Sequence, residues 1–585
     1  MRWGTVRIAA GQGRPKAMLS AASALLSRLA PAEAISRRDA LALAIITILH
    51  LAALAVMTAT ELDLATKATF LLAWALLNFF WLALLRRPAI AALLSLAMVI
   101  TLIMLSQFKY DKLMMTVNFV DLMIIDPDTS AFLFTIMPRL RGPILLGVAI
   151  AVPTLVLLWR IDPFRVRMRT SALGSTLCMG GLVAFSIAYP ADFYGEFFSR
   201  DYVSKFARSG VEAVYEFATH GLLESDATVT EPLKAPALAC SPGGKLPHII
   251  LLHDESSFDI TAAPGIKVPP GYQRHFRSFD GKARKLVVEG AGGPSWFTEY
   301  NVLTGLSARS YGRFATSVTR IAAGHVARGL PNALGRCGYR TFSLYPFYGA
   351  FLGSRSFQTT AGVERYLDMK DLGARGLEPD NFYFDQATNI IARERGQGPL
   401  FLFVYTAANH FPWDFRYRPE LTPGWHDLGN AANIDEYIRR QTLSAHDYSA
   451  LLDRLKRDFP TESFLIVRFG DHQPEFGYRI IDPSLSESEL AHHLEAFDPR
   501  YYTSYYAVDA VNFKPVDLSS ALNTLDAPYI PLLVQEAAGV PLDPSFAEQK
   551  KILKRCHGLF YRCNGGAEAS RFNRMLIDAG LIKGL

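Results

Sequence analysis

Long apolar runs crowd into the first 190 residues of this chain, and they constrain its fold more than any other feature. The runs lie at about 39–59, 66–85, 88–107, 142–159 and 170–190. Each approaches the ~20 residues that a helix needs to cross ~30 Å of hydrocarbon, and five in close succession are not expected of a soluble core. The first run is also too long for the core of a cleaved signal peptide. We therefore predict an α-helical transmembrane domain of five spans over residues 39–190.

The charges of the connecting loops predict how these spans are oriented. The N-terminal segment 1–38, the turn at 86–87 and the loop 160–169 are all basic, whereas the first loop on the other side carries Glu61 and Asp63. Positively charged loops stay in the cytoplasm. This rule places the N-terminal segment inside the cell and everything after the fifth span on the periplasmic or extracellular side of the cell (inner) membrane.

A juxtamembrane segment, residues 191–246, is expected to follow the spans. Apolar residues recur at helical spacing within 193–223, which predicts one or two amphipathic helices. Such a helix packs against the globular domain or lies on the outer leaflet, and both roles are compatible. A looser stretch, 224–246, leads into the domain that we place at 247–585.

The remaining composition narrows the class of protein. A formal net charge of +6 is modest and gives no reason to expect a nucleic-acid partner. Four of the five cysteines fall in the outer part of the chain, an even number that suits disulfides in an oxidising compartment: Cys240, Cys337, Cys556 and Cys563. Cys556 and Cys563 could close a small local loop. None of the four has zinc-finger spacing.

From residue 247 onward, short apolar runs alternate with helical stretches, such as 321–335 and 434–457. The candidate strands are His248–Leu252, Lys285–Val288, Arg340–Leu344, Leu400–Tyr405 and Phe464–Phe469. This alternation is typical of an α/β domain with a parallel sheet. Ligands of such sheets bind outside the carboxyl edge, so the residues that follow the strands are the candidate site.

Four of these strands lead into side chains suited to metal and phosphate chemistry. The first leads to Glu255 and the last to Asp471 and His472. Carboxylate and imidazole together suit Zn²⁺ or Mn²⁺. The loops after the other two strands carry Arg355, whose planar fork matches phosphate oxygens, and His410.

Ser295 follows the second strand, after a Gly-Gly-Pro turn and at a predicted helix start. The positive end of a helix dipole favours a phosphate or a serine alkoxide there. A plain N-cap serine is the simpler reading of this residue taken alone. In the company of a divalent ion, Ser295 could act as a nucleophile in phosphoryl transfer.

Taken together, these motifs resemble the alkaline phosphatase superfamily. Within it they are most similar to the membrane branch that contains lipoteichoic acid synthases and phosphoglycerol transferases of periplasmic glucans, over nearly the whole chain. The matching motifs are Asp254-Glu255-Ser256, Gly293-x-Ser295-x-x-Thr298-Glu299-Tyr300, Asn409-His410-Phe411-Pro412 and Gly470-Asp471-His472. The resemblance implies a sulfatase-like fold for the outer domain.

The resemblance also implies roles for individual residues. The metal ligands would be Glu255, Ser295, Asp471 and His472, binding one Mn²⁺ or Zn²⁺ ion, with Mg²⁺ less suited. Ser295 would be the nucleophile, where close relatives commonly have threonine. The expected catalytic and substrate-binding residues beside it are His410, Arg355 and Trp413. Thr298 is the alternative nucleophile, and Asp254 could replace Glu255 as a ligand.

The activity implied is transfer of a phosphoglycerol head group from a membrane phospholipid, phosphatidylglycerol, to an envelope glycan or lipid acceptor through a covalent Ser295 ester. One alternative is phosphoethanolamine transfer to lipid A or glycan. Another is a catalytically silent envelope scaffold or sensor. A true sulfatase is disfavoured, because the segment after Ser295 lacks the Pro and Arg of the C/S-x-P-x-R context.

Overall fold

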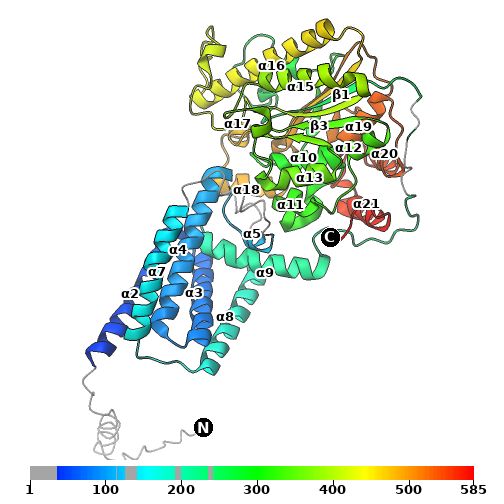
Figure 1. Ribbon diagram of the computed structural model, residues 1–585. Coiled ribbons are helices and arrows are strands. Elements are labelled where there is room, and N and C mark those ends of the chain that lie inside the picture. Colours follow the sequence, from blue (N-terminus) through cyan, green and yellow to red (C-terminus); the bar gives the residue numbers. More distant parts are fainter. Residues whose placement is uncertain (1–35, 114, 125–140, 191–198, 235–239, 241–242) are drawn as a thin grey trace, which may run out of the picture. The chain divides into compact units, whose positions relative to one another are not determined.

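The structure, a computed structural model, describes residues 36–113, 115–124, 141–190, 199–234, 240 and 243–585 (Figure 1). The chain divides into two compact units. One comprises residues 1–101 and 144–181, and the other comprises residues 102–143 and 182–585. The first unit contains most of the apolar helices, and the second contains the sheet.

Five long apolar helices occupy the predicted membrane region. They are α2 (Arg37–Thr60), α3 (Leu64–Leu85), α4 (Pro88–Leu113), α7 (Arg141–Ile161) and α8 (Met168–Ala188). Among the described residues, four helical stretches are long and apolar enough to cross a membrane, in α2, α3, α4 and α8. The described part of α7 adds a shorter apolar helix, Leu145–Ile161. The helices are therefore where the sequence predicts them, and the count of five spans stays a prediction.

Basic residues draw several helix ends of this unit together. At the start of α2, Arg38 Nε donates to the carbonyl oxygen of Ile161, 3.0 Å away at the end of α7. The guanidinium of Arg87, at the start of α4, donates to the carbonyl oxygen of Asp162. The Asp162 carboxylate in turn accepts a hydrogen bond of 2.8 Å from the backbone N–H of Ala89. The predicted cytoplasmic loops thus meet at the same end of these helices, as the loop charges require.

The second unit also contains two helices that precede the sheet in the sequence, α5 (Phe119–Met123) and α9 (Tyr202–His220). On α9, Glu212 forms an ion pair of 2.7 Å with Arg313 of the 3₁₀ segment η5 (Ala308–Ser317). The predicted amphipathic helix therefore packs on the globular domain, while Tyr215 and Phe217 of α9 remain exposed. Residues 193–198 of the predicted helical stretch lie outside the described residues.

An eight-stranded sheet forms the centre of the second unit. Its strands are β1 (His248–Asp254), β2 (Arg284–Val287), β3 (Arg340–Leu344), β4 (Arg365–Leu367), β5 (Leu400–Tyr405), β6 (Phe464–Gly470), β7 (Thr503–Val511) and β8 (Thr524–Asp526). The order is β4-β3-β5-β1-β6-β7-β2-β8. All five predicted strands are confirmed. The expected parallel pairing is found between β1, β3, β4, β5 and β6 and between β2 and β8, whereas β7 runs antiparallel to both β6 and β2.

Because β7 is antiparallel to both of its neighbours, β6 and β2, the strand β2 runs in the same direction as β1 and β6. The carboxyl ends of β1, β2, β5 and β6 therefore lie at one edge of the sheet. This shared edge is what brings residues more than 200 positions apart into one site.

Helices cover both faces of the sheet (Figure 1). They are α10 (Ser295–Thr304), α11 (Val318–Ala322), α12 (Leu330–Arg336), α13 (Ser354–Thr360), α14 (Met369–Leu372), α15 (Asp380–Glu394), α16 (Ala432–Asp458), α17 (Gly477–Ile481), α18 (Glu487–Glu495), α19 (Ile530–Ala538), α20 (Pro544–Cys556) and α21 (Ala567–Asp578). The predicted helix 434–457 is confirmed within α16. The predicted stretch 321–335 is interrupted, because Gly324 takes a φ of +80° and Val326 forms a β-bridge to Ile582.

Alternation along β1 decides which side chains face which layer. Ile249 and Leu251 pack in the core that holds α10 and α19, whereas Ile250 and Leu252 pack in the core that holds α15 and α16. Successive side chains of a strand point to opposite faces. Continuing this period, His253 lies on the α10 side and Asp254 on the α16 side.

Two disulfides join cysteines of the second unit, Cys240–Cys337 and Cys556–Cys563. The second closes the short loop that the sequence suggested. The first ties the segment before β1 to the end of α12. Disulfides persist in oxidising compartments, so their presence agrees with a domain outside the cytoplasm.

A buried carboxyl at the end of β8 gives the domain a pH-dependent weakness. Asp526 is 8% exposed, and its Oδ1 has no hydrogen-bond partner among the described residues. Burial raises its pKa to about 7 from the ordinary 3.8, and nearby Glu289 adds to the effect. The folded state therefore holds a proton that the unfolded chain releases. This contribution to stability is complete below the unfolded pKa and is lost as pH rises towards 7, at ~1.4 kcal/mol per pH unit.

We expect Asp526→Asn to remove this loss, because the amide carries no charge to bury. The melting temperature of the purified chain should exceed that of the wild type at pH 8, and the difference should shrink as the pH falls and close near pH 4. The control is Asp517→Asn, since hydrogen bonds from Ser519 lower the pKa of that exposed carboxyl. An Asp526→Asn variant that follows the wild-type pH profile would contradict the assignment.

Candidate metal and phosphoryl-transfer site

The carboxyl edge of the sheet gathers a compact group of polar side chains. His253 and Glu255 come from the end of β1, and Asp471 and His472 directly follow β6. Ser295 is the first residue of α10. Any side chain at Gly470 would overlap the carbonyl oxygen of Ser257, so only glycine lets β6 approach β1 this closely before Asp471.

Ser295 presents its hydroxyl to this group. Its Oγ lies 3.1 Å from His472 Nε2 and 3.5 Å from Glu255 Oε2. The residue opens a helix of ten residues, whose positive dipole end favours negative charge at that position. The predicted juxtaposition of Ser295 with Glu255 and His472 is present in the structure.

Glu255 is held as an acceptor by two hydroxyl donors. The hydroxyl of Tyr405 donates to its Oε2 at 2.6 Å, and the hydroxyl of Ser256 donates to its Oε1 at 2.7 Å. Ser256 itself has a positive φ of 50°, a costly backbone conformation that occurs where other contacts enforce it. These contacts fix the orientation of a buried carboxylate whose remaining lone pairs face the site.

The two oxygens of the Asp471 carboxylate have different surroundings. Its Oδ1 accepts the N–H groups of Ser256, at 2.7 Å, and of His472, at 2.9 Å. Its Oδ2 is buried and has no hydrogen-bond partner among the described residues. Burial alone would raise the pKa of Asp471, but the imidazoles of His472 and His253 lower it well below its ordinary value.

His472 is oriented by its own backbone neighbourhood. Its Nδ1–H donates to the carbonyl oxygen of Gln473 at 2.8 Å. In the neutral ring this leaves the lone pair of Nε2 free, 3.1 Å from Ser295 Oγ and 3.3 Å from Asp471 Oδ2. A metal-ligating histidine commonly has its other nitrogen held in this way.

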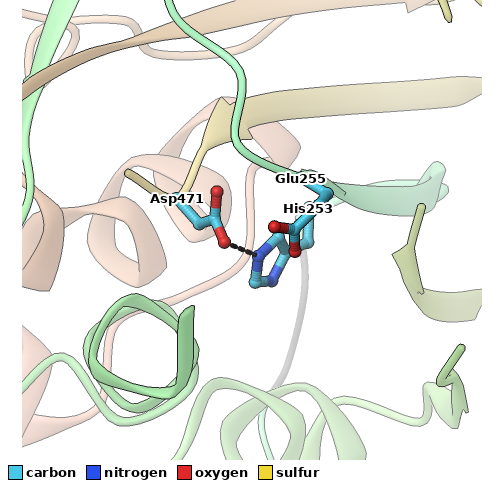
Figure 2. Close-up of side chains that lie close together, drawn as sticks. All are labelled: His253, Glu255 and Asp471. Carbon is cyan, nitrogen blue, oxygen red and sulfur yellow. Dashed lines mark ion pairs between the residues drawn. The ribbon is translucent and has the colours of Figure 1, made fainter. Parts of the chain in front are cut away.

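The donor set fits a divalent cation. His253, Glu255 and Asp471 each offer one ligand atom, and these atoms lie within 4.8 Å of one another (Figure 2). The unpartnered Oδ2 of Asp471 is the kind of buried atom that an ion satisfies. Carboxylate oxygens with imidazole nitrogens suit Mn²⁺ and Zn²⁺ alike.

The loop after β5 carries two further residues predicted from the sequence. His410 is half-buried, and its Nδ1–H donates to the carbonyl oxygen of Phe411 at 2.7 Å. Trp413 is 7% exposed and its indole N–H donates to the carbonyl oxygen of Asn409, so its side chain belongs mainly to the packing of the domain. Arg440 of α16 donates to the carbonyl oxygens of His410 and Pro412, which fastens the loop to the domain.

Arg355 lies in a different electrostatic setting from the one predicted. Its guanidinium is 2.9 Å from Asp368 and 3.0 Å from Asp371. It also donates to the carbonyl oxygen of Tyr366. The structure does not show Arg355 in contact with the Ser295 group.

The structure shows where the side chains of the two alternative residues lie. Thr298 is buried, and its hydroxyl donates to the carbonyl oxygen of Asp471 at 2.6 Å, so it supports the site from behind. Asp254 faces the opposite layer, where it pairs with His275 at 2.8 Å. The side chains that lie beside His472 Nε2 are those of Ser295 and Glu255.

Sequence reasoning missed His253 and Tyr405. His253 stacks on the Tyr405 ring with centroids 3.7 Å apart, and Tyr405 reaches Glu255. The period of two along β1 was the available signal, since it places His253 on the same face as Glu255. Tyr405 has no such signal, because its role depends on the pairing of β1 with β5.

The fold and site define an α/β domain built around a buried metal-type centre with an adjacent serine. The model of the sulfatase family matches residues 295–511. This part of the chain is therefore similar to the sulfatase family, in agreement with the expected resemblance to the alkaline phosphatase and sulfatase superfamily. A comparison with curated protein sequences gave no match.

Several solved structures share partial similarity with the chain. Streptococcus pyogenes phosphoglycerol transferase GacH, in complex with sn-glycerol-1-phosphate, is 14% identical, with a TM-score of 0.45 over 59% of this chain and 88% of that one. The lipoteichoic acid synthase LtaP from Listeria monocytogenes is 14% identical, with a TM-score of 0.38 over 53% and 76%. Lipooligosaccharide phosphoethanolamine transferase A (EptA) from Neisseria meningitidis is 13% identical, with a TM-score of 0.37 over 71% and 83%.

Proposed function

We propose that this chain is a membrane-bound phosphotransferase that moves a phosphoglycerol head group from phosphatidylglycerol to a hydroxyl of an envelope glycan. The observation that carries the proposal is the Ser295 hydroxyl at the start of α10, 3.1 Å from His472 Nε2 and 3.5 Å from the Glu255 carboxylate. A hydroxyl so placed, beside a set of metal-type ligands, suits nucleophilic attack on a phosphodiester. We choose glycerol as the head group because the motifs resemble the phosphoglycerol transferase branch of the superfamily.

The reaction would run in two displacements at Ser295. In the first, Ser295 Oγ loses its proton and bonds to phosphorus, while the bond from phosphorus to the diacylglycerol oxygen breaks and that oxygen takes up a proton. In the second, a glycan hydroxyl loses its proton and bonds to phosphorus, while the bond from phosphorus to Ser295 Oγ breaks and that oxygen takes up a proton. When bound by Glu255, Ser295, Asp471 and His472, Mn²⁺ or Zn²⁺ would favour the serine alkoxide and neutralise phosphate charge.

The residues around Ser295 would share the remaining tasks. We assign His410 to the phosphate and to proton transfer at the leaving oxygen, because its Nδ1 is held by Phe411 and its Nε2 is left to the substrate. Trp413 would support this loop. Arg355 would reach a phosphate only if its pairs with Asp368 and Asp371 opened, so its part is the smallest.

The proposed location of the chain in the cell follows from its proposed phospholipid donor. A lipid substrate requires the site to work at a membrane surface, and the apolar helices of the first unit would anchor the chain there. Loop charges and the two disulfides favour the outer side of the cytoplasmic membrane for the sulfatase domain. We therefore propose a multi-pass protein of the inner membrane with a periplasmic or extracellular domain.

The test uses the full chain in lipid nanodiscs with Mn²⁺. One sample contains phosphatidylglycerol and the other phosphatidylethanolamine, each labelled in the head group, and the Ser295 peptide is analysed by mass spectrometry. We expect a phosphoglycerol adduct on Ser295. A phosphoethanolamine adduct would contradict the donor and keep the reaction class. An unmodified Ser295 in both samples would favour a silent scaffold.

A further inference from the structure

His253 is a buried histidine whose two ring nitrogens form no hydrogen bond with the described residues. The side chain is fully buried at the end of β1. Among the described residues, neither Nδ1 nor Nε2 has a hydrogen-bond partner. Leaving a buried polar atom unsatisfied costs about 1–3 kcal/mol, so such an atom calls for a partner that protein atoms do not supply.

The packing of His253 accounts for the faces of its ring and not for its edge. Tyr405 stacks on one face, with centroids 3.7 Å apart, and Phe469 lies at 5.1 Å. If the ring of His253 served only for packing, a phenylalanine at this position would fill the space equally well. The nitrogens at the edge therefore need a separate account.

The edge of the ring faces the Asp471 carboxylate. His253 Nε2 is 2.9 Å from Asp471 Oδ2, an ion-pair distance (Figure 2), yet neither atom makes a hydrogen bond. The same Oδ2 lies 3.3 Å from His472 Nε2. Two atoms that are close without bonding to each other are expected where both face a common ion.

Resting on the proposed function, we propose that His253 Nε2 is a further ligand of the same divalent cation. The donor set would then include Glu255, Ser295, Asp471 and two imidazoles, one from the end of β1 and one from the residues directly after β6. Position on β1 supports this set, because His253 and Glu255 lie on the same face. The ligand atoms of His253, Glu255 and Asp471 are within 4.8 Å of one another.

The direct test counts imidazoles around the metal in the wild-type chain. The full-length protein in detergent is loaded with one equivalent of Zn²⁺, and X-ray absorption at the zinc edge measures the number of imidazole ligands. We expect two. A single imidazole would overturn the role of His253 and leave the proposed function standing, whereas a wild-type chain that binds no Zn²⁺ would contradict the proposed metal site as a whole.

A matched pair of variants sharpens the result. His253→Phe keeps a ring against Tyr405 and removes both nitrogens, so we expect one imidazole and a Zn²⁺ dissociation constant raised about 100-fold or more. Circular dichroism of the metal-free variant checks that the fold is kept, since the ring that packs on Tyr405 is retained. Tyr405→Phe keeps the stack and the count of two imidazoles. An unchanged Zn²⁺ affinity in His253→Phe would also overturn the proposal.

Discussion

Replacing Ser295 by alanine is expected to lower head-group transfer by a factor on the order of 10⁴ or more while leaving the fold intact. The loss follows from removal of the oxygen that we propose carries the covalent ester, and deletion of a catalytic nucleophile has effects of this size. The Ser295 side chain is only partly buried and makes contacts no shorter than 3.1 Å. Initial rates of labelled glycerol phosphate transfer, with circular dichroism as the check on folding, measure the outcome.

Two variants control this experiment. Ser295→Thr retains a hydroxyl at the same helix position and should keep measurable transfer. Thr298→Ser keeps the hydrogen bond to the Asp471 carbonyl and should stay near the wild-type rate. Transfer by Ser295→Ala together with loss of transfer on changing Thr298 would move the nucleophile to Thr298.

Asp471→Asn is expected to produce the second large effect, a loss of Mn²⁺ or Zn²⁺ affinity of at least roughly 100-fold with a matching loss of activity. The amide oxygen can still accept the N–H groups of Ser256 and His472, so the local backbone should stay in place. The negative charge next to His253 and His472 disappears. Calorimetric titration measures the affinity directly.

Thermal melting provides an independent reading of the same variant. A ligand at 100 times its dissociation constant stabilises the folded state by about 2.7 kcal/mol, so Zn²⁺ should raise the melting temperature of the wild type but not of Asp471→Asn. The matched control is Asp254→Asn, which changes a neighbouring carboxylate on the opposite face, paired with His275. Equal loss of metal affinity in both variants would show that charge near the site, and not ligation by Asp471, is responsible.

Local sequence patterns were sufficient for the elements and for most of the candidate site. The apolar runs predicted the long helices because a membrane-length helix leaves an uninterrupted apolar stretch. The strand runs at 340–344 and 400–405 match β3 and β5 residue for residue. Ser295 and the Asp471-His472 pair were found because the residues that follow parallel strands meet at one edge of the sheet.

Other features depended on contacts that leave no trace in neighbouring residues. Arg355 has the right chemistry for phosphate, but the approach of Asp368 and Asp371, which follow β4, decides what its guanidinium binds. The reversal of β7 could not be read from its composition, since an apolar strand looks the same in either direction. His410 owes its fixed loop to Arg440, 30 residues away on α16.

The amino-acid sequence by itself determined the long apolar helices, the α/β pattern and the serine, carboxylate and imidazole of the candidate site, because these follow from periodicity and from residue type at strand ends. Only the tertiary structure decided which carboxylate faces Ser295, that Tyr405 supports Glu255, and that His253 turns its unpartnered edge towards Asp471. Those relations are set by strand pairing and by which face of β1 each side chain occupies, and both arise only when distant segments pack together.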